Sequence, residues 1–439
     1  MWMLRALPTM ARLASHGYYR VSLGGAEPPR DGPALVVANH TNSLLDVAFV
    51  VLAARRRVRF MAKAPLFSYP GLGWIVKGVG SVPVYRRQDN PKLVAQNLDV
   101  FRDVHAAIAE GYAVGIFPEG TSHSAAHLQP LKSGAARLAL GAAAQLGGKA
   151  FPIVPIGMMF ADRQTFRSRA RVVVGESCVW DDLAPRGPDD RDAVRELTRR
   201  IEASMRRVTV NLHDWTDATL VQVAADIWEA EFDGPRDDRA HVERITVITR
   251  ALAQLRLGED QGWRSVVREL RAHDRVLGRL GLTPRTLRSD PSARTAFPWF
   301  AHQAPRLLMV PIAALGLLLL WVPREVTGTI GTKASKKEGD DSIPTFRVMY
   351  GGVIFGAWFL AIAGAVGAAY GWAAGVLAFV LFPPFAFLAM AVGESQRFVW
   401  QSVRRFFVLR RHPERVAALR QRQHSLAQRM KDLLRDVSA

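Results

Sequence analysis

The sequence predicts an α/β domain with a mostly parallel sheet flanked by helices, followed by a helical region and a C-terminal membrane hairpin. Two observations predict this class. Between residues 34 and 180, short strand-like runs alternate with stretches of helical spacing, which is typical of a parallel sheet. The run 348–393 carries no charged residue, and about twenty apolar residues suffice to cross a bilayer.

The elements of the α/β domain follow one another in order along the chain. Strands are predicted at 34–40, 58–63, 80–86, 112–120 and 150–160, and helices at 43–56, 90–111 and 131–147. Ligand sites of parallel sheets lie at the carboxyl ends of the strands. Polar residues gather at three of these ends, so we expect the site there: Asn39 and His40, Arg86, and Glu119 with Gly120.

Composition divides the rest of the chain into segments of different character. We expect an amphipathic interfacial helix at 1–28, the α/β domain at 29–185, a charged helical region at 186–300, an interfacial or re-entrant segment at 301–323, a cytoplasmic loop at 324–348, a two-helix transmembrane hairpin at 349–393 and a basic cytoplasmic tail at 394–439. The stripe of the N-terminal helix can equally pack on the domain's own core. The apolar stretch 307–323 is short and contains Pro311, which favours a segment that does not span.

Charge and cysteine content narrow the function classes. Lys and Arg outnumber Asp and Glu by 58 to 39, giving a net charge of +19 and indicating phosphate-bearing partners. The single cysteine, Cys178, excludes an internal disulfide framework and a multi-cysteine metal site, and we expect it to be buried. The Ala-, Arg- and Gly-rich composition indicates a bacterial source, so we expect the bacterial inner membrane. The positive-inside rule and a non-spanning 307–323 predict that the α/β domain faces the cytoplasm.

The stretch NHTNSLLD combines a base with an acid that can orient it. His40 ends a predicted strand, and Asp46 falls in the first turn of the next helix. A carboxylate on one ring nitrogen fixes the tautomer and leaves the other nitrogen free to accept a proton. No G-x-S-x-G sequence occurs, so the attacking hydroxyl belongs to the substrate. A helix cap beside an ordinary polar side chain is the alternative interpretation.

The stretch FPEGT predicts a turn that binds phosphate or hydroxyl groups. Gly120 has no Cβ to keep an anion from the backbone, and Thr121 or Ser122 can begin the next segment. Glu119 can hold a substrate hydroxyl, Lys132 supplies positive charge, and the planar Arg86 guanidinium can bind a phosphate through two hydrogen bonds.

Four blocks in order resemble those of the glycerophospholipid acyltransferase family: Asn39-His40 with Asp46, and then 80–86, 117–121 and 154–157. The resemblance covers about residues 30–160. Five residues separate His40 from Asp46, where most members have four, and PLK-x-G follows at 130–134. These two features, together with Ser122 followed by His123, resemble the branch that includes fungal glycerol-3-phosphate/dihydroxyacetone-phosphate acyltransferases. Ser122 stands where the family usually has arginine, leaving Lys132 or Arg137 as substitutes.

The resemblance implies transfer of a fatty acyl group from acyl-CoA or acyl carrier protein to glycerol 3-phosphate or 1-acylglycerol 3-phosphate, in phospholipid biosynthesis. It implies these roles: His40 as base, supported by Asp46; Arg86, Glu119, Gly120 and Lys63 as contacts of the glycerol phosphate; Val154 and Pro155 in the acyl-donor region. The chemistry of the FPEGT turn adds Thr121 and Lys132 to the expected substrate contacts. We expect no metal and no redox cofactor, because a thioester is already activated.

Three other functions compete with this one. A lysophospholipid remodelling acyltransferase or transacylase would use the same base with another acceptor. A catalytically silent lipid-binding membrane scaffold would keep the fold without turnover. A nucleic-acid binder is indicated by charge alone, without zinc spacing or aromatic RNA-binding signatures, so we expect membrane lipids and the two substrates as partners and no nucleic acid.

Overall fold

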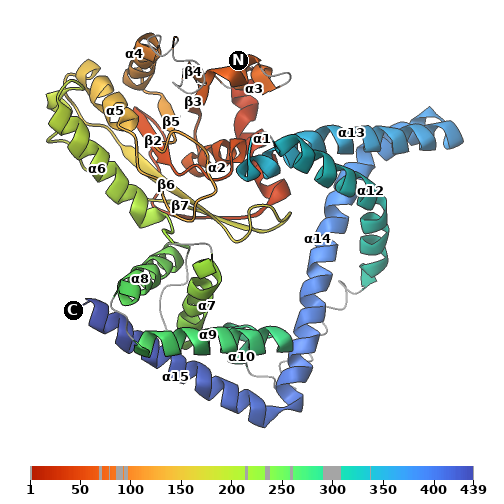
Figure 1. The fold of residues 1–439 in the computed structure, drawn as a ribbon. Coiled ribbons are helices and arrows are strands. Elements are labelled where there is room, and N and C mark those ends of the chain that lie inside the picture. Colours follow the sequence, from red (N-terminus) through yellow and green to blue (C-terminus); the bar gives the residue numbers. More distant parts are fainter. Residues whose placement is uncertain are drawn as a thin grey trace. The chain divides into compact units, whose positions relative to one another are not determined.

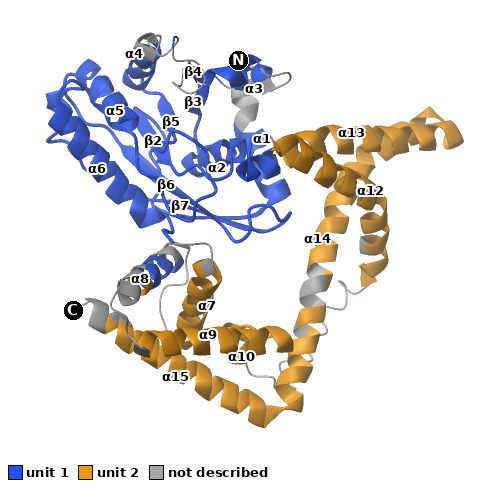
Figure 2. Ribbon diagram, in the orientation of Figure 1, with its two compact units in different colours: residues 1–215, 236–249, 338–345 blue, residues 216–235, 250–337, 346–439 orange. Residues whose placement is uncertain are grey.

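The computed structural model describes residues 2–68, 72–78, 80–85, 92, 97–212, 216–232, 238–257, 261–289, 308–336 and 338–438. The chain divides into two compact units, shown in different colours in Figure 2. Unit 1 comprises residues 1–215, 236–249 and 338–345, and unit 2 comprises residues 216–235, 250–337 and 346–439.

Within the described residues, unit 1 is built on a seven-stranded sheet with the order β1-β7-β6-β2-β5-β3-β4 (Figure 1). The strands are β1 (Arg20–Gly25), β2 (Ala34–Ala38), β3 (Val58–Lys63), β4 (Val82–Val84), β5 (Ala113–Ile116), β6 (Ile153–Phe160) and β7 (Arg169–Val174). Neighbouring strands run parallel except β6 and β7, which are antiparallel. The predicted mostly parallel sheet is therefore confirmed.

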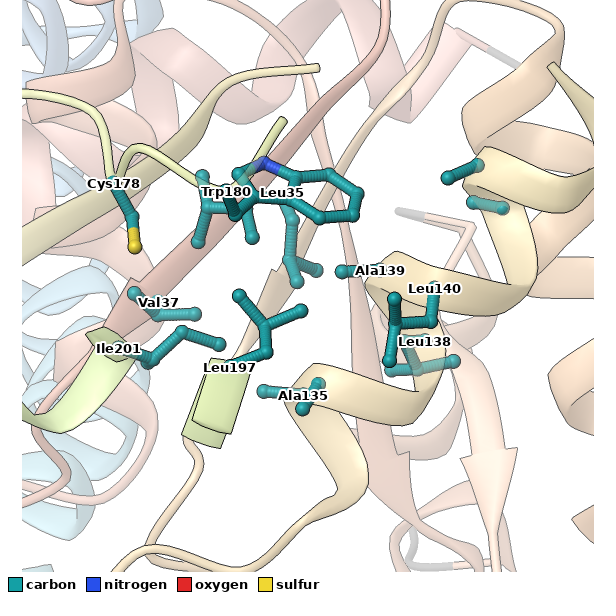
Figure 3. Close-up of a cluster of buried hydrophobic side chains, with 14 of the residues drawn as sticks. Leu35, Val37, Ala135, Leu138, Ala139, Leu140, Cys178, Trp180, Leu197 and Ile201 are labelled. Atoms are coloured by element: carbon teal, nitrogen blue, oxygen red, sulfur yellow. The ribbon is translucent and has the colours of Figure 1, made fainter. Parts of the chain in front are cut away.

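The helices of unit 1 are α1 (Trp2–Tyr18), α2 (Leu44–Ala54), α3 (Leu72–Gly78), α4 (Asn97–Ala109), α5 (Gly134–Gln145) and α6 (Arg191–Val208). The sheet packs against α5 and α6 through one hydrophobic cluster. In Figure 3 the labelled side chains of β2, α5 and α6, among them Leu35, Leu138 and Leu197, converge with Trp180. Each fully buried leucine of this kind stabilises the fold by about 1.5–3 kcal/mol.

Helix α6 forms as its sequence requires. Its N-cap, Asp190, accepts hydrogen bonds from the amides of Asp192 and Ala193. Its apolar residues recur every three or four positions and are buried: Ala193, Val194, Leu197, Ile201, Met205 and Val208. The end of α6 lies so close to β6 that a Cβ on Gly157 would be 1.8 Å from the Val208 carbonyl oxygen. A glycine is therefore required at this point of the strand.

The N-terminal part of unit 1 differs from the predicted helix at 1–28. Helix α1 ends at Tyr18, and the next residues form the edge strand β1, which pairs with β7. In α1, Ala11 and Tyr18 are buried, whereas Met10 and Leu13 are exposed. One side of this helix thus packs on the protein, and a role of its other side at a bilayer stays a prediction.

Unit 2 is helical. Its helices are α7 (Thr216–Glu231), α9 (Gln261–Leu280), α10 (Pro284–Leu287), α12 (Val310–Ser335), most of α13 (Ile343–Tyr370), α14 (Trp372–Arg411) and α15 (Pro413–Ser438), while α8 (Asp238–Leu257) is divided between the units. Among the described helices, α12, α13 and α14 are long and apolar enough to cross a membrane. Helix α12 continues to Ser335, so the loop expected from residue 324 is shorter than predicted.

Candidate functional site

The two polar loops of the site meet because β2 and β5 are neighbours in register. Val37 of β2 is paired with Ile116 of β5, so His40 and Glu119 each lie three residues beyond a matched pair. The amide of His40 donates to Glu119 Oε2 at 2.7 Å, and the amide of His123 donates to the His40 carbonyl oxygen at 3.1 Å. The predicted edge of the sheet therefore brings these loops together.

His40 and Asp46 are in contact. Asp46 Oδ2 lies 2.9 Å from His40 Nδ1 and also accepts from the amides of Thr41 and Asn42, at 2.8 and 2.7 Å. The Asp46 side chain is fully buried, and this burial raises its pKa, while the three donors act in the opposite direction. When His40 Nδ1–H donates to this carboxylate, Nε2 is the nitrogen left to accept a proton.

The turn from His40 to Asp46 accommodates five intervening residues because one of them has a positive φ. Ser43 has φ 50°, in the left-handed region, and its amide donates to Ser122 Oγ at 3.3 Å. Asn42 is fully buried, and its Nδ2 donates to the hydroxyl of Tyr19 at 2.8 Å. Tyr19 in turn donates to the carbonyl oxygen of Arg163, and burial raises its pKa, so the hydroxyl stays protonated.

Phe117 fixes the plane of the His40 ring. The two rings are stacked, with centroids 4.0 Å apart and planes 10° apart. Phe60 lies behind Phe117 at 6.0 Å and 22°. This aromatic column and the contact with Asp46 leave the imidazole little freedom to rotate. The sequence indicated neither contact of Phe117, although this residue directly precedes the predicted turn.

Glu119 is buried, and protein donors engage both of its oxygens. Besides the His40 amide on Oε2, Oε1 accepts from His123 Nε2 at 2.7 Å and from the Gln129 amide at 2.9 Å. The amide of Ala125 donates to His123 Nδ1 at 3.1 Å, so the His123 proton lies on Nε2. This geometry holds His40 through its backbone. Contact of Glu119 with a substrate stays a prediction.

Arg163, between β6 and β7, joins the same two loops. Its Nη1 donates to the carbonyl oxygen of Thr41 at 2.9 Å and to that of His123 at 3.3 Å. Sequence reasoning missed this residue because it lies outside the recognised blocks and reaches the site only through the tertiary fold.

Lys132 lies over the turn of the third block. Gly120 has φ 78°, and a Cβ placed on it would be 2.5 Å from Lys132 Nζ. The Lys132 amide donates to the Pro118 carbonyl oxygen at 2.8 Å, which holds the lysine at this position. Thr121 is exposed beside it, whereas Arg137 Nη1 donates to the Pro188 carbonyl oxygen at 3.3 Å. The turn therefore presents the ammonium group of Lys132.

The other predicted residues have different surroundings. Lys63 ends β3 and forms an ion pair with Glu338, with Nζ 2.8 Å from Oε2. Arg86 lies outside the described residues, just after β4. Val154 and Pro155 are buried in β6, paired with Val36 and Val37 of β2, and their role toward an acyl donor stays a prediction.

A metal site needs several His, Cys, Asp or Glu side chains placed close together. In the part of the chain that the structure describes, no group of three or more His, Cys, Asp or Glu side chains is placed to hold a metal ion. Cys178 is buried, as expected, and burial raises the pKa of its thiol.

Comparison with known proteins points to one family. Residues 20–159 match the family described as Acyltransferase. The chain is 34% identical to glycerol-3-phosphate O-acyltransferase 2 of Saccharomyces cerevisiae over 36% of this chain and 21% of that protein. It is 30% identical to a chloroplastic 1-acyl-sn-glycerol-3-phosphate acyltransferase of Brassica napus, over 34% of this chain and 40% of that protein.

A solved structure is also similar. PlsC, the 1-acyl-sn-glycerophosphate acyltransferase of Thermotoga maritima, matches with 20% identity and a TM-score of 0.35, over 47% of this chain and 78% of that chain.

The matched stretch spans about a fifth of the yeast relative and two fifths of the plant relative. These two relatives are eukaryotic and give no support to the bacterial membrane inferred from composition. The contact between His40 and Asp46 and the turn at Glu119 and Gly120 both lie inside the matched stretch. Residues 20–159 therefore match the Acyltransferase family and are distantly similar to glycerol-3-phosphate and 1-acylglycerol-3-phosphate acyltransferases.

Proposed function

We propose that this protein is a membrane-bound O-acyltransferase of phospholipid biosynthesis. It moves a fatty acyl group from acyl-CoA or acyl carrier protein to a hydroxyl of glycerol 3-phosphate or 1-acylglycerol 3-phosphate. The observation that carries the proposal is the contact between His40 Nδ1 and Asp46 Oδ2 at 2.9 Å, at the carboxyl end of β2. The names of the distant relatives support the class of acceptor.

The reaction needs one general base. His40 Nε2 accepts the hydroxyl proton as the acceptor oxygen attacks the thioester carbonyl carbon, and Asp46 stabilises the imidazolium that forms. The tetrahedral intermediate then collapses, the C–S bond breaks, and the thiolate takes the proton from His40. The fixed plane of the ring, held by Phe117 and Asp46, favours this transfer because the base is already oriented before the acceptor binds.

The acceptor phosphate needs positive charge beside the base. Lys132, on the turn that adjoins His40, supplies an ammonium group next to the backbone of Gly120. Lys63 ends β3 and Arg86 follows β4, the next two strands of the sheet, and we propose both as further phosphate contacts. Thr121 can donate its hydroxyl to the same phosphate. Glu119 then contributes to the reaction mainly by accepting the hydrogen bond of the His40 amide, which holds the base in place.

Membrane attachment suits lipid products. The apolar helices of unit 2 hold the enzyme at the bilayer, where an acylated product can enter the leaflet directly. The net charge of +19 favours an anionic membrane surface. We propose that the catalytic domain faces the cytoplasm, where the basic segments that flank the hairpin are expected.

One assay tests the proposal and separates the alternatives. Purified full-length protein is incubated with radiolabelled acyl-CoA, or with acyl carrier protein carrying the same acyl group. Glycerol 3-phosphate, dihydroxyacetone phosphate, 1-acylglycerol 3-phosphate and lysophosphatidylcholine are offered in parallel. Transfer to glycerol 3-phosphate or 1-acylglycerol 3-phosphate supports the proposal, and transfer to dihydroxyacetone phosphate alone would replace the proposed acceptor. Transfer to lysophosphatidylcholine alone identifies a remodelling enzyme, and no transfer in any arm identifies a silent scaffold.

A further inference from the structure

The three apolar helices of unit 2 are not equivalent, although each is long enough to cross a bilayer. They follow one another along the chain as α12, α13 and α14. The elements that precede and follow this series decide how many of the three cross, because each crossing moves the chain to the other side of the membrane.

The segments at the two ends of the series pack together within unit 2. Arg405 Nε, near the end of α14, donates to the Gly281 carbonyl oxygen at 3.1 Å, and Arg420 Nε of α15 donates to the Leu287 carbonyl oxygen at 2.7 Å. A hydrophobic cluster joins the same segments through Leu277, Leu282, Leu287, Leu409 and Val416. Segments in such contact lie on one side of a bilayer, so an even number of crossings separates them.

The sequence between α10 and α12 offers no further candidate for a crossing. The sequence from 288 to 309 carries Arg288, Arg294 and Arg306, and it has no apolar run of the length that a crossing needs. An even number of crossings must therefore be made by three helices, so at least one of the three does not cross.

Helices α13 and α14 behave as a pair. Only Gly371, with φ 93°, separates them. They pack closely near this turn, where a Cβ on Gly375 would lie 3.0 Å from the Gly367 Cα. Because the two helices pack together at this turn, they cross as one hairpin, so α12 is the helix that does not cross.

The sequence of α12 also disfavours a crossing. Arg324 and Glu325 lie near the middle of the helix and are exposed, so a spanning α12 would place both charges against lipid deep in the hydrocarbon. Both lie next to Pro323, inside the helix. A proline at this position bends a helix, and Figure 1 shows α12 changing direction along its length.

A specific contact compensates for this proline. Pro323 has no N–H, so the Leu319 carbonyl oxygen loses its partner four residues later in the helix. The Trp358 indole of α13 donates to that oxygen at 3.0 Å. Beyond the bend, a Cβ on Gly331 would lie 3.0 Å from the Arg347 Cα, which is farther from the turn at Gly371 than Trp358 is. The second part of α12 therefore runs back along α13, away from the tip of the hairpin.

We propose that α12 is a re-entrant helix in the leaflet nearest α10 and α15. It enters this leaflet, bends at Pro323 and returns to the side from which it came, while α13 and α14 cross as a hairpin. The partner of α12 is the acyl-chain region of that single leaflet. The exposed apolar side chains of α12 that contact it are Leu315, Leu317, Leu318, Trp321 and Val322.

Contacts inside unit 1 agree with this path. Glu338, just after α12, pairs with Lys63 at 2.8 Å, and Thr345 Oγ1, in the first turn of α13, donates to the Asn42 carbonyl oxygen at 3.5 Å. The connection from α12 to α13 thus reaches the loop that carries His40. A re-entrant α12 leads the chain back to these contacts at residues 338–345.

Cysteine labelling of the full chain in sealed membrane vesicles tests this path. Cys178→Ser provides a cysteine-free parent, and single cysteines are placed by Ser289→Cys, Lys336→Cys, Tyr370→Cys and Glu414→Cys. A membrane-impermeant sulfonated maleimide is applied to vesicles of each orientation, before and after detergent. We expect positions 289, 336 and 414 to react from one face and position 370 from the opposite face.

Ser289→Cys, just after α10, distinguishes a spanning α12 from a re-entrant α12 most clearly. A spanning α12 would make Ser289→Cys react from the face of Tyr370→Cys, and this result would overturn the proposal. Reaction of Tyr370→Cys from the face of Glu414→Cys would overturn the crossing hairpin. Labelling after detergent and an unchanged gel-filtration profile confirm that each variant is folded and reactive. The readout needs no enzymatic activity, so failure of the proposed function would not affect it.

Discussion

His40 Nδ1 lies 2.9 Å from Asp46 Oδ2, and this carboxylate oxygen also accepts the amide hydrogens of Thr41 and Asn42. Asp46 thereby fixes both the ring and the turn that carries it. Stacking of Phe117 on the imidazole adds a third constraint. A base held from three directions requires little reorganisation before it accepts a proton, and the predictions below follow from this arrangement.

Asp46→Asn should lower kcat by at least about 100-fold, because the amide supports the imidazolium less well and can favour the wrong tautomer. The acceptor KM should change little, since Asp46 does not face the phosphate. Steady-state kinetics with varied acceptor measures both constants. A fall in kcat/KM caused by KM alone would contradict the role of Asp46.

The same substitution should change how stability depends on pH. Burial raises the pKa of Asp46 above its ordinary value of 3.8, so the folded chain holds this proton more strongly than the unfolded chain does. That stabilisation is complete below pH 3.8 and is lost as the pH rises through the raised pKa. The thermal midpoint of wild type relative to Asp46→Asn should therefore fall across this window. A thermal midpoint of wild type that rises relative to that of Asp46→Asn as the pH increases would contradict this prediction.

Lys132→Ala should raise the KM for the phosphate-bearing acceptor by about tenfold or more, the effect of losing one charge-assisted hydrogen bond of about 1.5–3 kcal/mol. Arg137→Ala is the matched control, because Arg137 carries the same charge on α5 but donates to the Pro188 carbonyl oxygen. Its acceptor KM should stay at the wild-type value. Equal effects of the two substitutions would show that general charge, rather than the turn, binds the acceptor.

His123→Ala should lower the unfolding free energy by about 1–3 kcal/mol, because the buried Glu119 loses the donor at 2.7 Å. Since Glu119 holds the His40 amide, kcat should fall as well. His123→Gln, whose side-chain amide can still donate, should recover part of both losses. Thermal unfolding in detergent and kinetics at saturating acceptor measure the two effects. Stability lost at unchanged kcat would limit His123 to a structural role.

Much of the fold could be predicted from local patterns. Strands β2 to β6 lie within the predicted ranges, because each is a short apolar run between helical or turn-forming segments. The strands β1 and β7 were missed, since RVSLGG and RARVVV mix arginines and glycines with their apolar residues. Strand β1 forms by pairing with β7, and β7 also pairs with β6. In α12, Arg324 and Glu325 made the end of the apolar run look like a loop, although the helix continues beyond them.

The site was predictable where chemistry lies within one short block. The spacing of His40 and Asp46 indicated a contact, and Ser43 with φ 50° shows how five intervening residues fit. The stack on Phe117, the hydrogen bonds of Arg163 and the engagement of Glu119 by His123 depend on how distant loops meet. Such contacts follow from the register of the sheet, which a single sequence does not specify.

The most direct test of the central claim compares purified wild type with His40→Ala in transfer of a labelled acyl group to the acceptor that wild type uses. We expect the substitution to lower kcat by about 100-fold to 10,000-fold, the contribution of a general base, with an unchanged thermal midpoint and membrane insertion. Transfer by His40→Ala at a rate close to that of wild type would show that His40 is not the base and would contradict the proposed mechanism.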